Sequence, residues 1–263
     1  MELVYLGEKM DFTSILGFII GTAMLLGGQI FEGSSISQLM QVTAAMIVLG
    51  GTLGAVIISF PASQLKDAII YLKDVYLKLK IDYEETISEI ITYAAKARRE
   101  GLIALEKDAQ SASDSLLKLG LDSVADGVDP VLVKEMLETQ LVQLESNVNG
   151  ASKVWESAGA YAPTFGIIGA VMGLIQVMQN LSDPTKLGTG IAVAFVATIY
   201  GLFAANLVFI PISTKIRTKY AKVFTKKELI IEGILSIQAG ESPTLIERKL
   251  NAFVLDKHLA KSE

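Results

Sequence analysis

The side chains with chemical potential near the end of this chain are prolines and hydroxyls inside two apolar stretches, residues 161–179 and 188–212. The candidates are Pro163, Thr164, Thr198 and Pro211. A proline leaves a backbone carbonyl without its helical donor, and a threonine hydroxyl offers an oxygen. Neither stretch contains Asp, Glu, Lys, Arg or His, so a titrating group would have to come from elsewhere. The plain alternatives are prolines that mark helix ends and hydroxyls that bond to their own helix.

Hydropathy places these two stretches among four candidate membrane spans. Half of the 263 residues (51%) are hydrophobic and 19% are charged, so the charges must be segregated. Each run lacks an internal ionisable residue and has about the 20 residues that cross a bilayer. The spans are residues 12–30, 40–60, 161–179 and 188–212. The first run is too long for a typical signal peptide and lacks a good cleavage site, so we expect a retained helix.

Basic residues are distributed asymmetrically about these spans. Of the 23 Lys and Arg, 11 lie in residues 61–160 and 10 follow residue 212. The positive-inside rule therefore predicts that both termini and the middle segment face the cytoplasm. Two short turns, residues 31–39 and 180–187, are then the parts outside the membrane.

The polar parts have helical patterns of their own. Apolar side chains at three- and four-residue steps predict one continuous amphipathic helix over residues 61–118. A turn-rich stretch, Gly120–Asp129, interrupts this pattern. Asp129 as N-cap and Pro130 as the first helical residue then start a new helix that leads to the third span. A last helix is expected from Pro243 to about Leu259.

Together these patterns predict an all-α integral membrane protein with four transmembrane helices. The expected parts are residues 1–60 with the first two spans, a helical cytoplasmic domain at 61–160, residues 161–212 with the last two spans, and a cytoplasmic helical tail at 213–263. No catalytic motif or acidic cluster with metal spacing is found, and there is no Cys. We therefore expect no enzyme, no cofactor, no bound metal and no nucleic-acid partner.

Small residues recur at helical spacing within the spans. Gly17 and Gly21, Gly50 and Gly54, and Gly169 and Gly173 form G-x-x-x-G pairs. Such pairs let helix backbones approach closely in lipid. The plain interpretation is packing within one subunit, and the alternative is a surface for another subunit or a narrow wet pathway.

The sequences APTFGIIGAVMGLI and GTGIAVAFVATIYGLFAANLVFIP resemble the last two membrane helices of the flagellar stator A subunit, the MotA/PomA family, within the MotA/TolQ/ExbB group. The resemblance extends over four spans and the cytoplasmic segment, and AKARREGLIALEKD resembles the family's rotor-facing motif. It implies a subunit of the bacterial cytoplasmic membrane that couples ion flow to rotor torque. It also implies five copies around two copies of a single-span, peptidoglycan-binding MotB-like partner, which supplies an ion-binding aspartate, and contact with a flagellar rotor switch-complex protein.

The resemblance assigns roles to particular residues. Pro163 and Pro211 match the family's functional prolines, and Thr198 matches the threonine near the partner's aspartate, whereas Thr164 is a weaker match that can instead cap a helix start. Ala170 stands where sodium-driven members carry a threonine. Because sodium needs oxygen ligands and a proton needs only a carboxylate and water, Ala170 favours proton coupling over sodium.

The rotor contact falls on charged residues. Arg98 and Glu106 match the family's oppositely charged pair, and the adjacent Arg99 can share the role. On a continuous helix this spacing is about 12 Å with an offset near 80°, so both would share a broad face. Gly101 between them can bend or end the helix, which would change that geometry. The plain alternative is a solvated charged face.

Two other functions are compatible with parts of the pattern. An ExbB/TolQ-type energy transducer would share the group, but those proteins have three spans with the large segment after the first. A structural membrane scaffold without ion flux would also explain the small-residue faces.

Overall fold

A computed structural model describes residues 5–181 and 184–259 of the chain. By the closeness of its Cα atoms in space, the chain divides into two compact units. The unit called here the apolar unit comprises Leu6–Lys78 and Asn147–Thr218, and the polar unit comprises Met1–Tyr5, Leu79–Ser146 and Lys219–Glu263. Each is described by itself.

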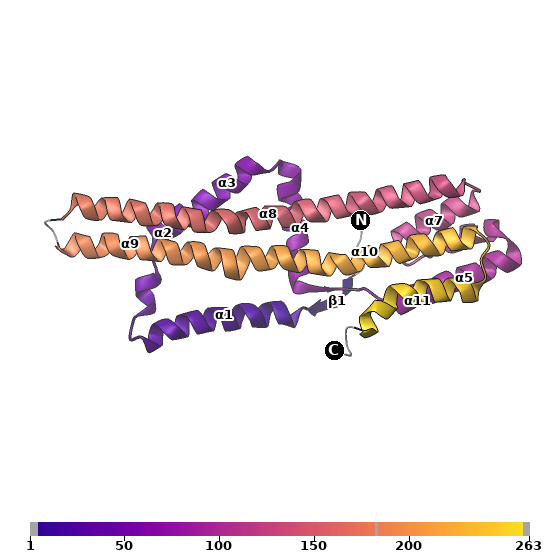
Figure 1. Cartoon of the computed structure of the whole chain (residues 1–263), viewed down its shortest axis with the longest axis horizontal. Coiled ribbons are helices and arrows are strands. Elements are labelled where there is room, and N and C mark those ends of the chain that lie inside the picture. Colours follow the sequence, from indigo (N-terminus) through magenta and orange to yellow (C-terminus); the bar gives the residue numbers. More distant parts are fainter. Residues whose placement is uncertain (1–4, 182–183, 260–263) are drawn as a thin grey trace. The chain divides into compact units, whose positions relative to one another are not determined.

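The structure is almost entirely helical, as the sequence predicts (Figure 1). The helices before residue 130 are α1 (Phe12–Phe31), η1 (Ile36–Leu39), α2 (Val42–Ala45), η2 (Met46–Gly50), α3 (Gly51–Ser59), α4 (Ala62–Tyr76), α5 (Tyr83–Glu100), η3 (Leu102–Leu105), α6 (Glu106–Ala109) and α7 (Ser115–Ala125). The later ones are α8 (Pro130–Gln179), α9 (Pro184–Phe203), η4 (Ala204–Phe209), α10 (Ile210–Gln238) and α11 (Pro243–Leu259). Two short strands, β1 (Tyr5–Met10) and β2 (Leu77–Leu79), pair with each other.

Four helical segments among the described residues are long and apolar enough to cross a membrane. Two of them, Phe12–Phe31 and Val42–Ser59, match the first two predicted spans. The other two, Pro130–Gln179 and Leu187–Gln238, contain the predicted third and fourth spans. The prediction of four apolar helices is therefore confirmed.

The third and fourth spans are parts of much longer helices. α8 begins at Pro130 as predicted, where the Val131 N–H donates to Asp129 Oδ1 at 2.9 Å, and it continues without a break through residue 161. A π-helical stretch, η4, joins α9 to α10 with helical backbone angles at both ends. The continuation of the fourth span into residues 215–227 is as the sequence predicts, because a helix can continue after its surface changes from apolar to polar.

The single helix predicted over residues 61–118 is wrong. The chain leaves helical geometry at β2, and Asp82 then caps α5 by accepting from the Glu85 N–H at 3.0 Å. α5 ends at Gly101, whose φ of +84° lies in the left-handed region that suits glycine. Asp114 later caps α7 by accepting from the Leu116 N–H at 2.8 Å.

The predicted turn around residues 120–129 is shorter than expected. Gly120 lies inside α7, where a Cβ would come within 2.1 Å of Ile234 Cδ1. The turn proper follows α7 and contains Gly127, with φ of +72°. The predicted last helix is confirmed as α11.

The core of the polar unit lies among α5, η3, α7, the first part of α8, the C-terminal part of α10, and α11. Its largest fully buried side chains are Ile90, Leu105, Leu117, Leu121, Leu137, Leu229, Ile230, Ile234, Ile246 and Leu250. Burial of such side chains is the main stabilising contribution in a small helical domain. Arg98, Arg99 and Glu106, at the end of α5 and the start of α6, remain exposed.

Candidate functional site

In the apolar unit, α8 and α9 run side by side and meet through glycines (Figure 1). We call this contact the α8–α9 seam; its glycines are Gly166, Gly169, Gly173, Gly190 and Gly201. A Cβ on Gly201 would lie 2.6 Å from the Ala162 carbonyl oxygen and 3.1 Å from Pro163 Cα. A Cβ on Gly166 would lie 3.0 Å from the Ala197 carbonyl oxygen. Backbone therefore contacts backbone, and these small residues pack within the chain.

The other glycine pairs behave differently. Gly21 lies against Leu207, whose Cδ2 would be 2.6 Å from an added Cβ. Gly17, Gly50 and Gly54 have no atom of the chain within 4 Å of an added Cβ. Packing within the chain thus accounts for the pair on the third span, for one member of the pair on the first span, and for neither member of the pair on the second.

Both candidate hydroxyls donate to their own helix. Thr198 Oγ1 donates to the Ala194 carbonyl at 3.2 Å and is half-buried, beside Gly166 in the seam. Thr164 Oγ1 donates to the Tyr161 carbonyl at 2.6 Å and is exposed. Because α8 does not begin there, Thr164 does not cap a helix start. Each oxygen keeps lone pairs that can accept a further hydrogen bond.

The two prolines lie within continuous helices. Pro163 is inside α8 and cannot donate to the Gly159 carbonyl four residues earlier. Pro211 is the second residue of α10, which begins directly after the π-helical stretch η4. A π-helical stretch is a local widening of the helix that accommodates the N–H that proline lacks. Neither proline ends a helix, so the interpretation of both as helix punctuation is wrong.

Each candidate proline lies at or next to a close contact between helices of the apolar unit. Pro163 lies against Gly201, and a Cβ on Gly159 would lie 2.6 Å from Ile210 Cγ1, next to Pro211. Ala170 is half-buried on α8 and contributes no side-chain oxygen.

Pro211 also borders a cavity of about 360 Å³ together with Gly17 and Lys215. Lys215 Nζ is 3.0 Å from Asp11 Oδ2 and donates to Thr13 Oγ1 at 2.9 Å. These polar groups at the start of α1 were not singled out from the sequence, because their partner is some 200 residues away.

A second polar cluster joins α8 to α10 within the apolar unit. Arg217 donates through Nε to Ser152 Oγ at 2.9 Å and through a terminal nitrogen to Glu156 Oε2 at 2.5 Å. Ser152 is completely buried. This cluster links the two proline-containing helices by a charge-assisted contact.

The charged candidates lie where α5 ends and the chain turns back. We call residues 98–108 the charged turn. Arg98 and Arg99 are exposed in the last turn of α5, and Glu106 is exposed at the start of α6. Gly101 and η3 separate them, so the spacing derived from a continuous helix is wrong, although all three side chains reach the surface.

The charged turn is anchored by apolar residues. Leu105 is completely buried in the core of the polar unit, whereas Ile103 is 75% exposed. η3 is a 3₁₀ turn, so its side chains do not follow the 3.6-residue period that the sequence pattern assumes. Ile103 therefore lies at the surface among charges, a position that the sequence did not indicate.

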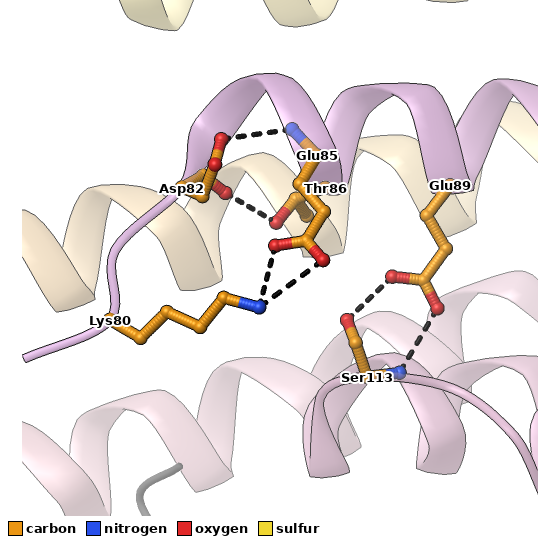
Figure 2. Close-up of polar contacts among 6 residues, drawn as sticks. All are labelled: Lys80, Asp82, Glu85, Thr86, Glu89 and Ser113. Atoms are coloured by element: carbon orange, nitrogen blue, oxygen red, sulfur yellow. Dashed lines mark hydrogen bonds and ion pairs between the residues drawn. The ribbon is translucent and has the colours of Figure 1, made fainter. Parts of the chain in front are cut away.

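Polar ties also fix the charged turn and the loop that follows it. Lys96 Nζ is 2.8 Å from Asp108 Oδ2, and Lys227 Nζ is 2.6 Å from Asp114 Oδ1. Glu89 on α5 binds Ser113, as Figure 2 shows. Within residues 5–181 and 184–259, no group of three or more His, Cys, Asp or Glu could hold a metal ion. Because these ties hold the charged turn in place, its exposed charges form a defined surface that a partner can recognise.

Comparison with known proteins identifies relatives across nearly the whole chain. Residues 15–101 match the family described as motility protein A N-terminal, and residues 108–229 match the MotA/TolQ/ExbB proton channel family. Motility protein A of Helicobacter pylori (strain ATCC 700392 / 26695) is 34% identical over 97% of this chain and 99% of its own length. The uncharacterized protein YtxD of Bacillus subtilis (strain 168) is 33% identical over 94% of this chain and 91% of its own. The flagellar MotAB stator complex of Bacillus subtilis contains a chain that superposes with a TM-score of 0.87 and 32% identity, over 96% of this chain and 100% of that one.

Proposed function

Because the chain belongs to the MotA/TolQ/ExbB proton channel family, and within it to the motility protein A proteins, we propose that it is the ion-conducting A subunit of a flagellar motor stator. Family membership and four apolar helices indicate a multi-pass protein of the bacterial cytoplasmic membrane. The observation that carries the proposal is similarity to motility protein A, and to a chain of a MotAB stator complex, along almost the full length.

The proposed stator contains a second subunit with one span, of the MotB type. Residues 161–179 and 188–212 of this chain contain no Asp, Glu, Lys, Arg or His, so the ion-binding carboxylate is assigned to that partner. Pro163, Thr164, Thr198 and Pro211 are proposed to line the path, with the Thr198 oxygen and the Gly159 carbonyl, to which Pro163 cannot donate, as acceptors. A homopentamer around a partner dimer is the proposed assembly, and the open glycines Gly50 and Gly54 are available for contacts between subunits.

The proposed ion is the proton. Ala170 gives the seam no hydroxyl at the position where sodium-driven relatives are expected to have one. The hydroxyl of Thr198 donates back to its own helix, which leaves its lone pairs to accept from water. A proton can pass along water, whereas sodium needs several oxygens in place of its hydration shell.

The charged turn is the proposed contact with the rotor switch-complex protein, with both termini and the polar unit in the cytoplasm. Arg98, Arg99 and Glu106 are exposed on a turn that Leu105 anchors in the core of the polar unit. Charges on such a surface steer and orient a partner more than they add affinity. This suits a contact that must form and break at every step.

An ExbB/TolQ-type transducer is the runner-up in the same group. The match of residues 15–101 to the motility protein A N-terminal family favours the stator. So does the order along the chain, in which two apolar spans precede residues 79–146 and two follow them.

The test is deletion and complementation in the source bacterium. Deletion of the gene should abolish swimming while flagella still assemble, and the wild-type gene should restore it. Arg98→Glu should lower swimming speed without lowering the amount of chain in the membrane, whereas Arg98→Lys, which keeps the positive charge, should lower it less. Normal swimming in the deletion strain would exclude this function.

A further inference from the structure

The segment that follows α5 folds back along that helix and is tied to it twice. Lys96 pairs with Asp108, 12 residues later, at 2.8 Å. Glu89, two turns earlier on α5, binds Ser113, 24 residues later. The tied partners become more distant in sequence toward the start of α5, which is the pattern of a chain that reverses direction. The charged turn lies at the reversal.

Glu89 is the more heavily bonded of these ties (Figure 2). Its Oε1 accepts from the Ser113 N–H at 3.0 Å and from the Tyr93 hydroxyl at 2.8 Å, and its Oε2 accepts from the Ser113 hydroxyl at 2.5 Å. Burial, and then the bond to Glu89, raise the pKa of the Tyr93 hydroxyl. The two bonds from Ser113 fix its distance and rotation relative to α5, and the bond from Tyr93, on the same helix as Glu89, orients the carboxylate that accepts them.

We propose that Glu89 is a positioning residue for the rotor contact: it holds Ser113, and through it the orientation of α6 and Glu106 relative to Arg98. This rests on the proposed function of the charged turn. α6 has only four residues, too few to be a stable helix alone. Leu105 and Ala109 anchor its inner face, but Gln110, Ser111 and Ser113 are exposed, so the end of the segment depends on its polar ties.

Glu89 acts through its bonds rather than by touching the rotor. Its side chain is half-buried, and both carboxylate oxygens accept bonds from within the polar unit. Glu85, one turn earlier on the same helix, provides the contrast. It is exposed, and its carboxylate meets Lys80 Nζ at 2.9 Å at the surface, beside the Asp82 cap (Figure 2). The two carboxylates allow a matched comparison.

The first test measures torque per stator unit in a bead assay with stepwise stator incorporation. Glu89→Ala removes three bonds and should lower the torque of each unit. Glu89→Gln should remain near wild type, because its amide oxygen can accept from Tyr93 and the Ser113 N–H while its NH₂ donates to the Ser113 hydroxyl. Glu85→Ala should have no effect. A direct charge contact with the rotor would instead make Glu89→Gln as defective as Glu89→Ala.

The second test measures order in the segment itself. The chain has no cysteine, so a spin label on Lys107→Cys, next to Glu106, reports on the charged turn alone. In the full stator complex, Glu89→Ala should shift the label spectrum toward faster motion, and Glu89→Gln and Glu85→Ala should not. Ser113→Ala should give a smaller shift, with no further loss when combined with Glu89→Ala, because both changes break the same tie.

The outcomes separate the two proposals. If deleting the gene leaves swimming intact, the stator function fails. If deletion abolishes swimming but Glu89→Ala keeps wild-type torque and an immobile label, the stator function stands and the positioning role is wrong. If Glu89→Ala lowers only the amount of chain in the membrane, with torque per unit unchanged, the residue stabilises the fold and the positioning role is equally wrong.

Discussion

The α8–α9 seam and the charged turn are held together by different physics. In the seam, glycine lets one backbone rest on another, so that an added Cβ at Gly201 would lie 2.6 Å from the Ala162 carbonyl oxygen. In the turn, a buried Leu105 and half-buried ion pairs fix the chain, and charges project outward. The seam provides shape and backbone oxygens but no charged side chain, whereas the turn provides charge. The difference explains why the proposed ion site needs a partner's carboxylate and the proposed rotor contact does not.

A large effect is expected from filling the seam. Gly201→Val would place side-chain atoms against the backbone of Ala162 and Pro163, which cannot move aside as a flexible side chain can. Overpacking costs about 1–3 kcal/mol or more, so the thermal midpoint of the detergent-solubilised protein and its amount in the membrane should both fall. Gly188→Val, on the same helix α9, adds the same volume where no atom of the chain lies within 4 Å. Equal midpoints for the two variants would contradict backbone contact in the seam.

An effect of comparable size is expected in the charged turn. Leu105→Ala should destabilise the protein by about 2–5 kcal/mol, the usual cost of truncating a fully buried leucine. Ile103→Ala, two residues earlier and 75% exposed, should change stability by less than about 0.5 kcal/mol. Denaturant unfolding of the full-length chain measures both. A comparable loss in the two variants would mean that η3 does not separate an inner anchor from an outer surface.

The smallest effect is expected from an ion pair at the edge of the polar unit. Lys249 Nζ is 2.7 Å from Glu241 Oε1, and this hydrogen bond lowers the pKa of Glu241 from 4.5 and raises that of Lys249. A carboxyl with a lowered pKa adds stability that is complete above pH 4.5 and is lost as pH falls through the folded-state value. Glu241→Gln should therefore reduce the loss of stability below pH 4.5 by less than about 1 kcal/mol.

The matched control for this pH effect is Glu247→Gln on α11, whose carboxylate is exposed. Melting midpoints between neutral pH and the acid limb measure both variants. An identical acid profile for Glu241→Gln and the wild type would show that the pair does not persist in solution.

The same contrast decides what the sequence could reveal. The spans were predictable because hydropathy and length are local properties, and the start of α8 was predictable because Asp129 and Pro130 form a local signal. The start of α5 had a local signal too: Asp82 is followed three residues later by Glu85, a pattern typical of helix starts. The apolar periodicity before and after Asp82 is nearly continuous, and it therefore predicts one helix in spite of this signal.

The candidate site was predictable only in part. The exposure of Arg98, Arg99 and Glu106 agrees with a surface role, but the geometry of the turn depends on how Gly101 and η3 reverse the chain. The Glu89–Ser113 and Arg217–Glu156 contacts join residues 24 and 61 positions apart. No local pattern reports such pairs, because they exist only after the helices pack.

The most direct measurement of the central claim is rotation of a bead on a single flagellar motor whose only stator contains this chain and its one-span partner. The account predicts torque that disappears when the proton gradient is collapsed, that does not change when sodium is replaced by potassium, and that is lost when the partner's membrane aspartate becomes asparagine. Torque that follows the sodium concentration, or that survives loss of the partner's aspartate, would contradict it.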